Sequence, residues 1–297
     1  MNIRWGVSPI AWANDDMPEL GGDTPLETIL DDAQRIGFDG IELGGKFPRD
    51  PQILSPILHR HALDLIGGWY SCNLLTQSAE EEIEAMADHL ALLDYFESPV
   101  FVIAETSNAT HSNRIVPFDQ APRLGTADWQ EFGARMSVVA NHVASRGMRL
   151  AYHHHLGTIV ETQDDLSRFL AATCDEVGLT LDTGHAALGG IDALDIITRH
   201  PKRIAHIHCK DVRRTVFNDT RSGGGSFLDG VVAGMFTAPG DGDLDYAAVM
   251  KALKTIGYAG WIVVEAEQDP AIANPFDYSR LGLATLKREA KAAGLIS

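Results

Sequence analysis

Three consecutive histidines, His153, His154 and His155, end the apolar run RLAYHHH at residues 149–155. Imidazole titrates near neutral pH and is the commonest metal ligand among side chains, so such a run suits proton transfer or metal binding. On a solvated surface the same cluster has neither use. Its meaning therefore depends on where the fold places this run.

Acids and imidazoles also follow other apolar runs. They are Glu42 in GIEL, Glu105 in VFVIAE, Asp182 and His185 in LDTGH, His206, His208, Lys210 and Asp211 in HIHCKD, and Glu265 and Glu267 in VVEAE. Polar side chains are common wherever a strand becomes a loop, so each one alone carries little weight. Their recurrence at four consecutive runs favours one divalent-metal site, because carboxylate and imidazole together suit Mn, Co, Fe, Zn or Mg.

Short apolar segments alternate with amphipathic ones along the chain. The apolar segments are predicted strands: IRWGVS, GIELGG, LDLIGGWY, PVFVIAE, RLAYHH, VGLTLD, RIAHIHCKD and WIVVEAE. Their nearly continuous hydrophobicity indicates burial on both faces, as in a parallel sheet covered by helices. The predicted helices include TPLETILDDAQRIG, AEEEIEAMADHLALLDYF, ADWQEFGARMSVVANHVASRG, DYAAVMKALKTIG and PFDYSRLGLATLKREAKAAG.

One helix-to-strand corner occurs twice, as RIGFDGIEL at 35–43 and TIGYAGWIVVE at 255–265. Gly37 and Gly257 are each placed to end a helix in the left-handed conformation before the chain reverses into a strand. This repetition predicts an α/β fold, a single (β/α)8 TIM-barrel domain over residues 1–297, with its site at the C-terminal ends of the strands. An open doubly wound sheet is the alternative, but no glycine-rich dinucleotide fingerprint follows the first strand.

The composition limits the partners. The formal net charge of −17 disfavours nucleic acids and anionic membranes, which attract basic surfaces. The cysteines, Cys72, Cys174 and Cys209, are odd in number and widely spaced, which fits a reducing compartment. No apolar run reaches the roughly 18 residues of a membrane span, and the start of the sequence shows no signal-peptide pattern. A cytoplasmic protein is expected.

Alternation along a strand separates neighbouring side chains. Residues two apart share a face, so His153 and His155 point one way and His154 the other. By the same count His206 and His208 share a face, and His208 lies nearer the mouth. We expect His208 to be a ligand, His206 to pack or orient within the barrel, and His154 to support a ligand or face the helices.

The motifs LDTGH, HIHCKD and VVE resemble the xylose isomerase-like TIM-barrel superfamily of sugar isomerases, epimerases and endonucleases. In that superfamily one divalent ion is held by Glu, Asp, His and Glu from four successive strands. The last three match Asp182, His208 and Glu265, and the first falls on His153, where the usual ALENH reads AYHHH. The resemblance implies the ligand set His153, Asp182, His208 and Glu265, with manganese or cobalt favoured.

Three irregular motifs, WGVSPIAWANDDMPELGGDTPLETIL, GIELGGKFP and YHHHLGT, are similar to inosose dehydratases, a branch of that superfamily. This resemblance covers most of the chain. It implies a lyase of myo-inositol catabolism that removes water from 2-keto-myo-inositol, a cyclic polyol ketone, to give a trihydroxycyclohexanedione. It is also compatible with a requirement for reduced glutathione and with a homo-oligomer.

Dehydration of a polyol ketone needs a metal to stabilise the developing enolate, a base for the alpha proton and an acid for the departing beta hydroxyl. The candidate acids and bases are Glu42, Lys46, His155, His185 and Glu265. For Lys46 the alternative, an ordinary solvated lysine on the surface, is equally expected. The segment 213–243 is expected to be a mobile loop, with its glycine-rich part at 220–243 closing over the mouth.

Other functions stay open. A sugar or inosose isomerase or epimerase on the same barrel would release no water, and a polyol-binding protein would need no metal. A metal-dependent nuclease is disfavoured by the net charge of −17. Trp12, Trp69 and Tyr70 could stack on a substrate ring or belong to the core. The segment 14–16 could bind hydroxyl groups or cap a turn.

Overall fold

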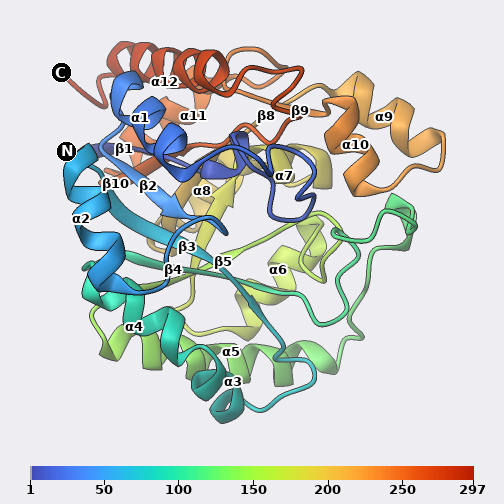
Figure 1. The fold of residues 1–297 in the computed structure, drawn as a ribbon. Coiled ribbons are helices and arrows are strands. Elements are labelled where there is room, and N and C mark those ends of the chain that lie inside the picture. The colour runs from blue at the N-terminus through green and yellow to red at the C-terminus, as the bar shows by residue number, and fades with distance from the viewer. Residues whose placement is uncertain (1) are drawn as a thin grey trace.

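A computed structural model describes residues 2–297. Eight parallel strands form a closed barrel in the order β1-β10-β7-β6-β5-β4-β3-β2 (Figure 1). The strands are β1 (Ile3–Val7), β2 (Gly40–Leu43), β3 (Asp64–Cys72), β4 (Val100–Glu105), β5 (Arg149–His153), β6 (Gly178–Asp182), β7 (Ile204–Cys209) and β10 (Gly260–Val264). Since β1 pairs with both β10 and β2, the barrel is closed, and the predicted fold and its eight strands are confirmed.

Twelve α-helices occur within residues 2–297, most of them around the barrel (Figure 1). They are α1 (Leu26–Ile36), α2 (Pro51–His61), α3 (Ala79–Ala85), α4 (Ala87–Tyr95), α5 (Asp128–Ser145), α6 (Gln163–Ala172), α7 (Thr183–Gly189), α8 (Ala193–Arg199), α9 (Arg214–Ser222), α10 (Phe227–Ala233), α11 (Tyr246–Thr255) and α12 (Pro275–Ala292). The single helix predicted over 79–96 is divided at Met86, which ends α3 and precedes α4.

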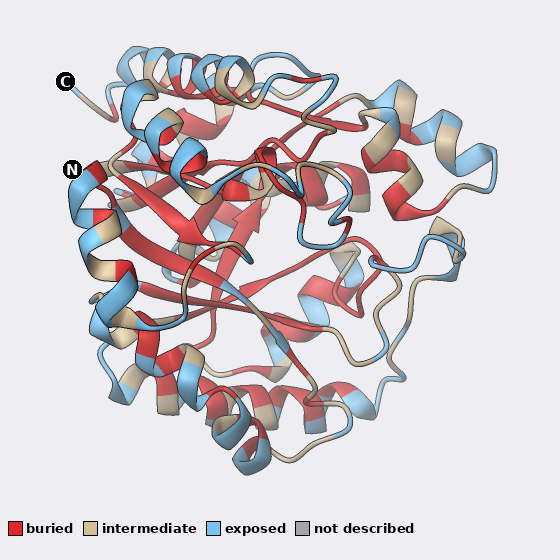
Figure 2. Ribbon diagram, in the orientation of Figure 1, coloured by how far each residue is buried: buried red, intermediate tan, exposed pale blue. Residues whose placement is uncertain are grey.

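Burial follows the layered plan of a barrel. All residues of β2, β4 and β6 are buried, whereas the outer helices bury one face and expose the other (Figure 2). This pattern confirms that the strands are covered on both sides. The interior of the barrel and the inner faces of the helices supply the core.

Two glycines turn helices into strands at the predicted corners. Gly37 ends α1 with φ of 95°, and Gly257 follows α11 with φ of 70°. These are left-handed backbone conformations in which a Cβ atom is unfavourable. The corners therefore direct β2 and β10 into the barrel as the repeat predicted.

The segment 213–243 is folded where the sequence suggested a loop. It contains α9, α10 and the strand β9 (Phe236–Thr237), which pairs with β8 (Asp211–Val212). Phe217, Phe227 and Val231 pack in an apolar cluster that also includes Met17, Leu156 and Leu188. The glycine run 223–225 lies between the two helices, and Ser226 begins α10 with a capping box. Figure 1 shows α9 and α10 on the side of the barrel opposite the chain termini.

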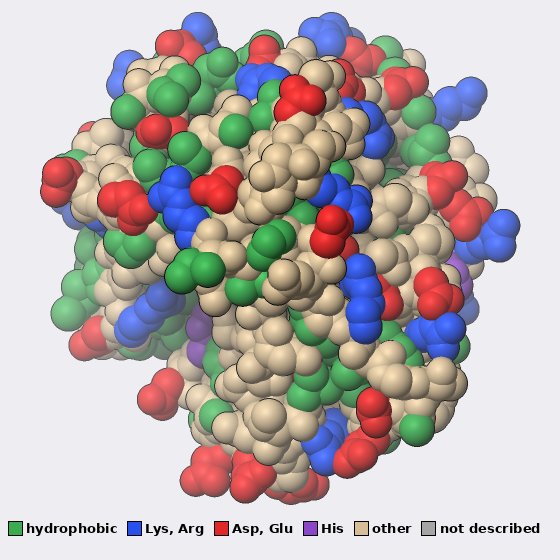
Figure 3. Space-filling view, turned by 90° about the vertical axis from the view of Figure 1, so that its right-hand side faces the viewer, with side chains coloured by type: hydrophobic (Ala, Val, Ile, Leu, Met, Phe, Trp, Pro, Cys, Tyr) green, Lys and Arg blue, Asp and Glu red, His purple; other side chains and the backbone are tan. Residues whose placement is uncertain are grey.

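The surface that carries α9 and α10 mixes both signs of charge. Figure 3 shows Lys and Arg side chains interspersed with Asp and Glu over this face rather than gathered into one basic patch. Within residues 2–297, none of the helices is both long enough and apolar enough to cross a membrane.

Candidate functional site

A cavity of about 310 Å³ lies at the C-terminal ends of the strands. Its walls come from the segments that follow β1 and β2, from β3 and β4, and from the ends of β5, β7 and β10. The polar and aromatic residues among its lining are Ser8, Asp15, Asp16, Glu42, Arg49, Trp69, His111, His153, His155, His208, Glu265 and Glu267. A TIM barrel places its active site at this end.

Four of the predicted site residues meet at the floor of the cavity. His153, Asp182, His208 and Glu265 each offer one ligand atom, and these atoms lie within 4.8 Å of one another. They come from the ends of β5, β6, β7 and β10, and all four are buried. We call them the inner cluster. The structure thus brings together the whole set that the resemblance implied, and their role as ligands stays a prediction.

The start of α7 orients the Asp182 carboxylate. Its Oδ1 atom accepts hydrogen bonds from the backbone N–H groups of Gly184 and His185, each at 2.8 Å. These bonds cap the helix and hold the carboxylate in place. The other oxygen, Oδ2, faces His153 Nε2 and His208 Nδ1, each at 3.8 Å.

The inner cluster contains buried acceptors without donors. Among the residues described, Asp182 Oδ2 and His208 Nδ1 have no hydrogen-bond partner. His208 Nδ1 also lies 2.5 Å from Glu265 Oε2 without the direction of a hydrogen bond. Although burial acts to lower it, Glu42 and Glu265 raise the pKa of His208 well above its ordinary value, so without a metal this ring carries the positive charge of the site. Buried polar atoms are normally paired, so the unpaired Asp182 Oδ2 beside these converging ligand atoms fits a bound cation. Two imidazoles and two carboxylates fit a divalent ion such as Mn, Co or Zn.

The protonation states are set by burial and by neighbouring charges. Burial, together with His208, lowers the pKa of His153 well below its ordinary value, so this imidazole is neutral as a metal ligand must be. Burial raises the pKa of Asp182 to about 6 against the opposing effect of Lys210. Although burial acts to raise it, Lys210 and His208 hold the pKa of Glu265 well below its usual range.

His155 lies beside the inner cluster and lines the cavity. Its Nδ1 atom lies 2.7 Å from the carbonyl oxygen of Leu156. A carbonyl only accepts, so Nδ1 carries the proton and Nε2 is left free to accept one. Burial, His111 and Lys210 lower the pKa of His155 well below its ordinary value. His155 is therefore a neutral imidazole at the cavity wall.

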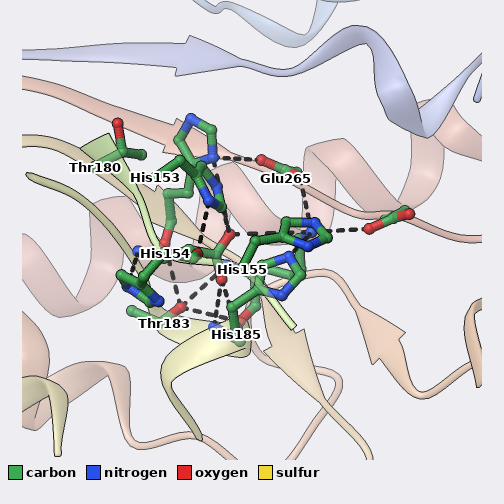
Figure 4. A network of polar contacts seen from close by, with 12 residues as sticks. His153, His154, His155, Thr180, Thr183, His185 and Glu265 are labelled. Atoms are coloured by element: carbon green, nitrogen blue, oxygen red, sulfur yellow. Dashed lines mark hydrogen bonds and ion pairs between the residues drawn. The ribbon is translucent and has the colours of Figure 1, made fainter. Parts of the chain in front are cut away.

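His185 stands behind His155, with ring centroids 3.8 Å apart (Figure 4). Its Nδ1 atom accepts from the backbone N–H of Leu156 at 3.3 Å, and its Nε2 atom lies 3.1 Å from Lys210 Nζ. His185 is buried and does not line the cavity. A substrate in the cavity would therefore not touch His185 directly.

His154 and His206 both lie outside the cavity lining, as alternation and position along their strands suggested. His154 Nε2 accepts from the backbone N–H of Asp182 at 3.3 Å, so it supports the inner cluster from the side. His206 Nε2 lies 2.9 Å from Glu42 Oε1 inside the barrel.

Lys210 is a site residue that the sequence argument placed at the mouth without giving it a role. It is 1% exposed, and its Nζ atom lies 2.8 Å from Glu265 Oε1 and 2.9 Å from Glu267 Oε2. Burial acts to lower the pKa of Lys210, but these carboxylates raise it above its ordinary value. Its position two residues after His208, directly past the end of β7, is the signal that could have identified it.

Lys46 is the predicted residue that the structure keeps apart from the others. Its ammonium donates to the carbonyl oxygen of Gly22, and it does not line the main cavity. Arg49, three residues further on, does line the cavity, as does His111. Neither of these two lies at a strand end, so the strand-end argument could not select them.

The remaining candidates divide between cavity and core. Trp69 lines the cavity, whereas Trp12 is buried and donates to Asp32 at 3.0 Å. Tyr70 donates to Glu82 at 2.9 Å outside the cavity. In the segment 14–16, Asn14 Oδ1 caps a turn, and Asp15 and Asp16 line the cavity, where binding of hydroxyl groups stays a prediction.

Known proteins resemble this chain along nearly its whole length. The rhizopine catabolism protein MocC of Rhizobium meliloti is 44% identical over 294 residues, which cover 99% of this chain and 90% of MocC. The inosose dehydratase of Geobacillus thermodenitrificans is 40% identical over 279 residues, covering 93% of this chain and 94% of that enzyme.

The fold has solved counterparts. The IOLI protein with a bound zinc atom superposes with a TM-score of 0.67 at 15% identity, covering 98% of this chain and 97% of that protein. Residues 30–289 match the xylose isomerase-like TIM barrel family. The closed barrel, this match and the relatives above together show that the chain belongs to the xylose isomerase-like TIM barrel family.

Proposed function

We propose that this protein is a metal-dependent dehydratase that removes water from inosose, 2-keto-myo-inositol. The observation that carries the proposal is the inner cluster at the floor of the cavity, with the neutral imidazole of His155 beside it. The 40% identity to an inosose dehydratase supports the substrate. A cavity of about 310 Å³ is within the size range of small-molecule sites.

The inner cluster would hold the ion. A divalent ion supplies Lewis acidity there, polarising a ketone oxygen and stabilising the negative charge of an enolate. We propose manganese or cobalt for this protein, whereas the solved IOLI protein binds a zinc atom. The carboxylates of Asp182 and Glu265 and the imidazoles of His153 and His208 are the donors.

His155 is the base. Its unprotonated Nε2 takes the proton from the carbon alpha to the ketone, and the electrons of that C–H bond pass into the enolate. The C–O bond at the beta carbon then breaks, and the departing hydroxide takes a proton to become water. The protonated His155 can supply this proton, which returns the imidazole to its starting state and balances the reaction.

Aromatic rings pack against His155 and hold its imidazole in place. The rings of Phe227 and His185 lie 5.1 Å and 3.8 Å from the His155 ring, between centroids. Lys210 holds the Glu265 carboxylate through a buried ion pair. Phe227 belongs to α10, so the segment 213–243 covers one side of the proposed base.

We propose that the segment 213–243 opens and closes over the cavity as a folded unit. A polyol ligand should then slow protease cleavage between α9 and α10. Cleavage at an unchanged rate with saturating ligand would contradict this part of the proposal.

Mass spectrometry tests the main proposal. Protein loaded with manganese or cobalt and incubated with 2-keto-myo-inositol should give a product lighter by one water, and chelation should stop its formation. A product of unchanged mass would indicate the isomerase or epimerase alternative. Binding without any product, with or without metal, would indicate a polyol-binding protein.

The 44% identity to MocC favours a second candidate, a role in rhizopine catabolism. The same assay with rhizopine in place of inosose separates the two. Reduced glutathione should be varied in both assays. Cys72 and Cys209 are buried and do not line the cavity, so we expect any thiol effect to arise without them. Gel filtration tests for a homo-oligomer.

A further inference from the structure

Three buried side chains form a hydrogen-bonded group in the barrel interior, and Glu42 and His208 among them line the cavity. Glu42 Oε1 lies 2.9 Å from His206 Nε2 and 2.9 Å from His208 Nε2. The three residues come from β2 and β7, and all are buried. We infer that Glu42 is a positioning residue that sets the tautomer and ring orientation of His208, so that His208 binds the metal through Nδ1.

The direction of these hydrogen bonds follows from the atoms involved. A carboxylate oxygen can only accept, so both imidazole Nε2 atoms must carry protons. For a neutral His208 this leaves Nδ1 unprotonated. That atom faces Asp182 Oδ2 at 3.8 Å and Glu265 Oε2 at 2.5 Å, inside the inner cluster. The tautomer is therefore the one that a metal ligand at Nδ1 requires.

This arrangement is a carboxylate supporting a histidine ligand. Hydrogen bonds of this kind orient the ring and increase its basicity, and their loss typically lowers metal affinity about 10- to 100-fold. His206 holds the same Glu42 oxygen from the other side, so the carboxylate is fixed by two rings. His206 thus has a use although it lies outside the cavity lining.

The same contacts argue against the role that strand-end position first suggested for Glu42. The Oε1 atom of Glu42 already accepts from two imidazole N–H groups, at 2.9 Å each. An oxygen held by two donors is poorly placed to take a proton from a carbon of the substrate. Glu42 lines the cavity, so the alternative of direct proton transfer needs an experimental test.

The first experiment identifies the ligand atom of His208. Protein labelled with ¹⁵N in histidine and loaded with ¹¹³Cd²⁺ should show coupling between the metal and His208 Nδ1, with Nε2 retaining its proton. Coupling to His208 Nε2 would overturn the inference. Loss of the Nε2 proton signal with coupling still at Nδ1 would overturn the hydrogen bond to Glu42.

The second experiment removes the carboxylate. Glu42→Ala should weaken Mn²⁺ or Co²⁺ binding by about 100-fold, and Glu42→Gln by about 10-fold, because an amide oxygen still accepts but carries no charge. The ligand-field absorption of bound Co²⁺ should shift in both variants. Glu42→Gln keeps the shape of the side chain and serves if Glu42→Ala does not fold.

Glu82 provides a matched control. It is a fully buried carboxylate that accepts from Tyr70 Oη at 2.9 Å and from the Asn73 backbone N–H at 2.7 Å, outside the cavity. Glu82→Gln should leave metal affinity and the Co²⁺ spectrum as in the wild type. Equal losses of affinity in the Glu42→Gln and Glu82→Gln variants would show a general effect of a buried mutation and overturn the positioning role.

The inference rests on the proposed metal site but not on the proposed substrate. If Glu42→Gln keeps wild-type metal affinity and spectrum while turnover is lost, Glu42 acts on the substrate and the positioning role is wrong. If the wild type dehydrates neither inosose nor rhizopine while the metal-binding differences appear as expected, the proposed function fails and the role of Glu42 stands.

Discussion

Two groups of histidines and carboxylates in this protein have similar spacing and different surroundings. The inner cluster lies at the floor of the cavity. The outer cluster consists of Glu27, Asp31 and His61 on α1 and α2, and its ligand atoms also lie within 4.8 Å of one another. Its carboxylates are about half exposed, at 53% and 56%, whereas the Asp182 side chain is 0% exposed.

Exposure to solvent decides how strongly these carboxylates depend on a counter-ion. In the outer cluster, water solvates Glu27 and Asp31, and Arg60 lies 3.6 Å from Glu27 as a counter-ion. In the inner cluster, Asp182 Oδ2 has neither water access nor a donor among the residues described. Burying charge is costly, and among residues 2–297 Lys210 alone lies within 4.0 Å of the three buried carboxylates Asp182, Glu265 and Glu267 as their lysine counter-ion, so the inner cluster gains more from a bound cation than the outer one. Spacing alone does not separate the two clusters, whereas burial and the missing hydrogen-bond partner of Asp182 Oδ2 do.

Removing the Asp182 carboxylate from the inner cluster should have the largest effect on metal content and turnover. We expect Asp182→Ala to lose its metal and at least about 10³-fold in turnover, the order seen when a main electrostatic stabiliser is removed. The barrel should stay folded, because residues at the mouth contribute little to the core. Metal analysis, circular dichroism and the dehydration assay check this. Full metal content in the inactive variant would instead make Asp182 an acid or base.

The triple histidine should respond unequally to alanine. His155→Ala should lose about 10²- to 10⁴-fold in turnover, the range for a general base, while keeping its metal. His154→Ala should lose much less, because His154 does not line the cavity. Turnover and metal content of both variants are the measurements. Greater sensitivity at His154 would show that the assignment of faces on this strand is wrong.

A carboxylate at position 153 would test why imidazole stands there. His153→Glu should still bind the metal but lose dehydration on the order of 10²-fold, because a negative ligand lowers the net charge that polarises the ketone. Exchange of the alpha proton with deuterium from solvent should continue slowly. NMR of the substrate in D2O, beside the dehydration assay, separates the two steps. Unimpaired dehydration would mean that the charge of this ligand is unimportant.

Acid should weaken metal binding at the inner cluster. Burial raises the pKa of Asp182 to about 6 in the metal-free protein, so protons compete for this carboxylate as the pH falls towards and below that value. Metal affinity should therefore fall steadily from pH 7 to about pH 5. Titrations with a competing chelator across this range check the direction. Constant affinity would show that Asp182 does not take up a proton there.

The outer cluster should give the smallest effect. His61→Gln is expected to leave metal content and turnover unchanged. It should lower the free energy of unfolding by about 1–3 kcal/mol, because His61 is buried and its Nδ1 lies 2.8 Å from the carbonyl oxygen of Ile57. Equilibrium dialysis with Mn²⁺ and chemical denaturation are the measurements. If the variant lost one equivalent of tightly bound metal, the outer cluster would also be a metal site.

The sequence by itself determined the strands, the corner glycines and the strand ends that carry the candidate ligands. Near-continuous hydrophobicity identified each barrel strand, and alternation separated His154 from His153 and His155. These signals are local, because strand periodicity and helix termination depend on neighbours a few residues away. The identity of the four residues in the inner cluster followed from the family resemblance of short motifs at strand ends.

Only the tertiary structure decided which distant side chains meet. Glu42 and His208 are 166 residues apart, and their hydrogen bond exists because the closed barrel brings β2 within reach of β7, with β1 and β10 between them. Lys210 meets Glu265 and Glu267, which follow β10, for the same reason. The segment 213–243 forms helices because its apolar side chains pack with Met17, Leu156 and Leu188 from distant parts of the chain. Such contacts depend on closure and packing, which no short stretch of sequence encodes.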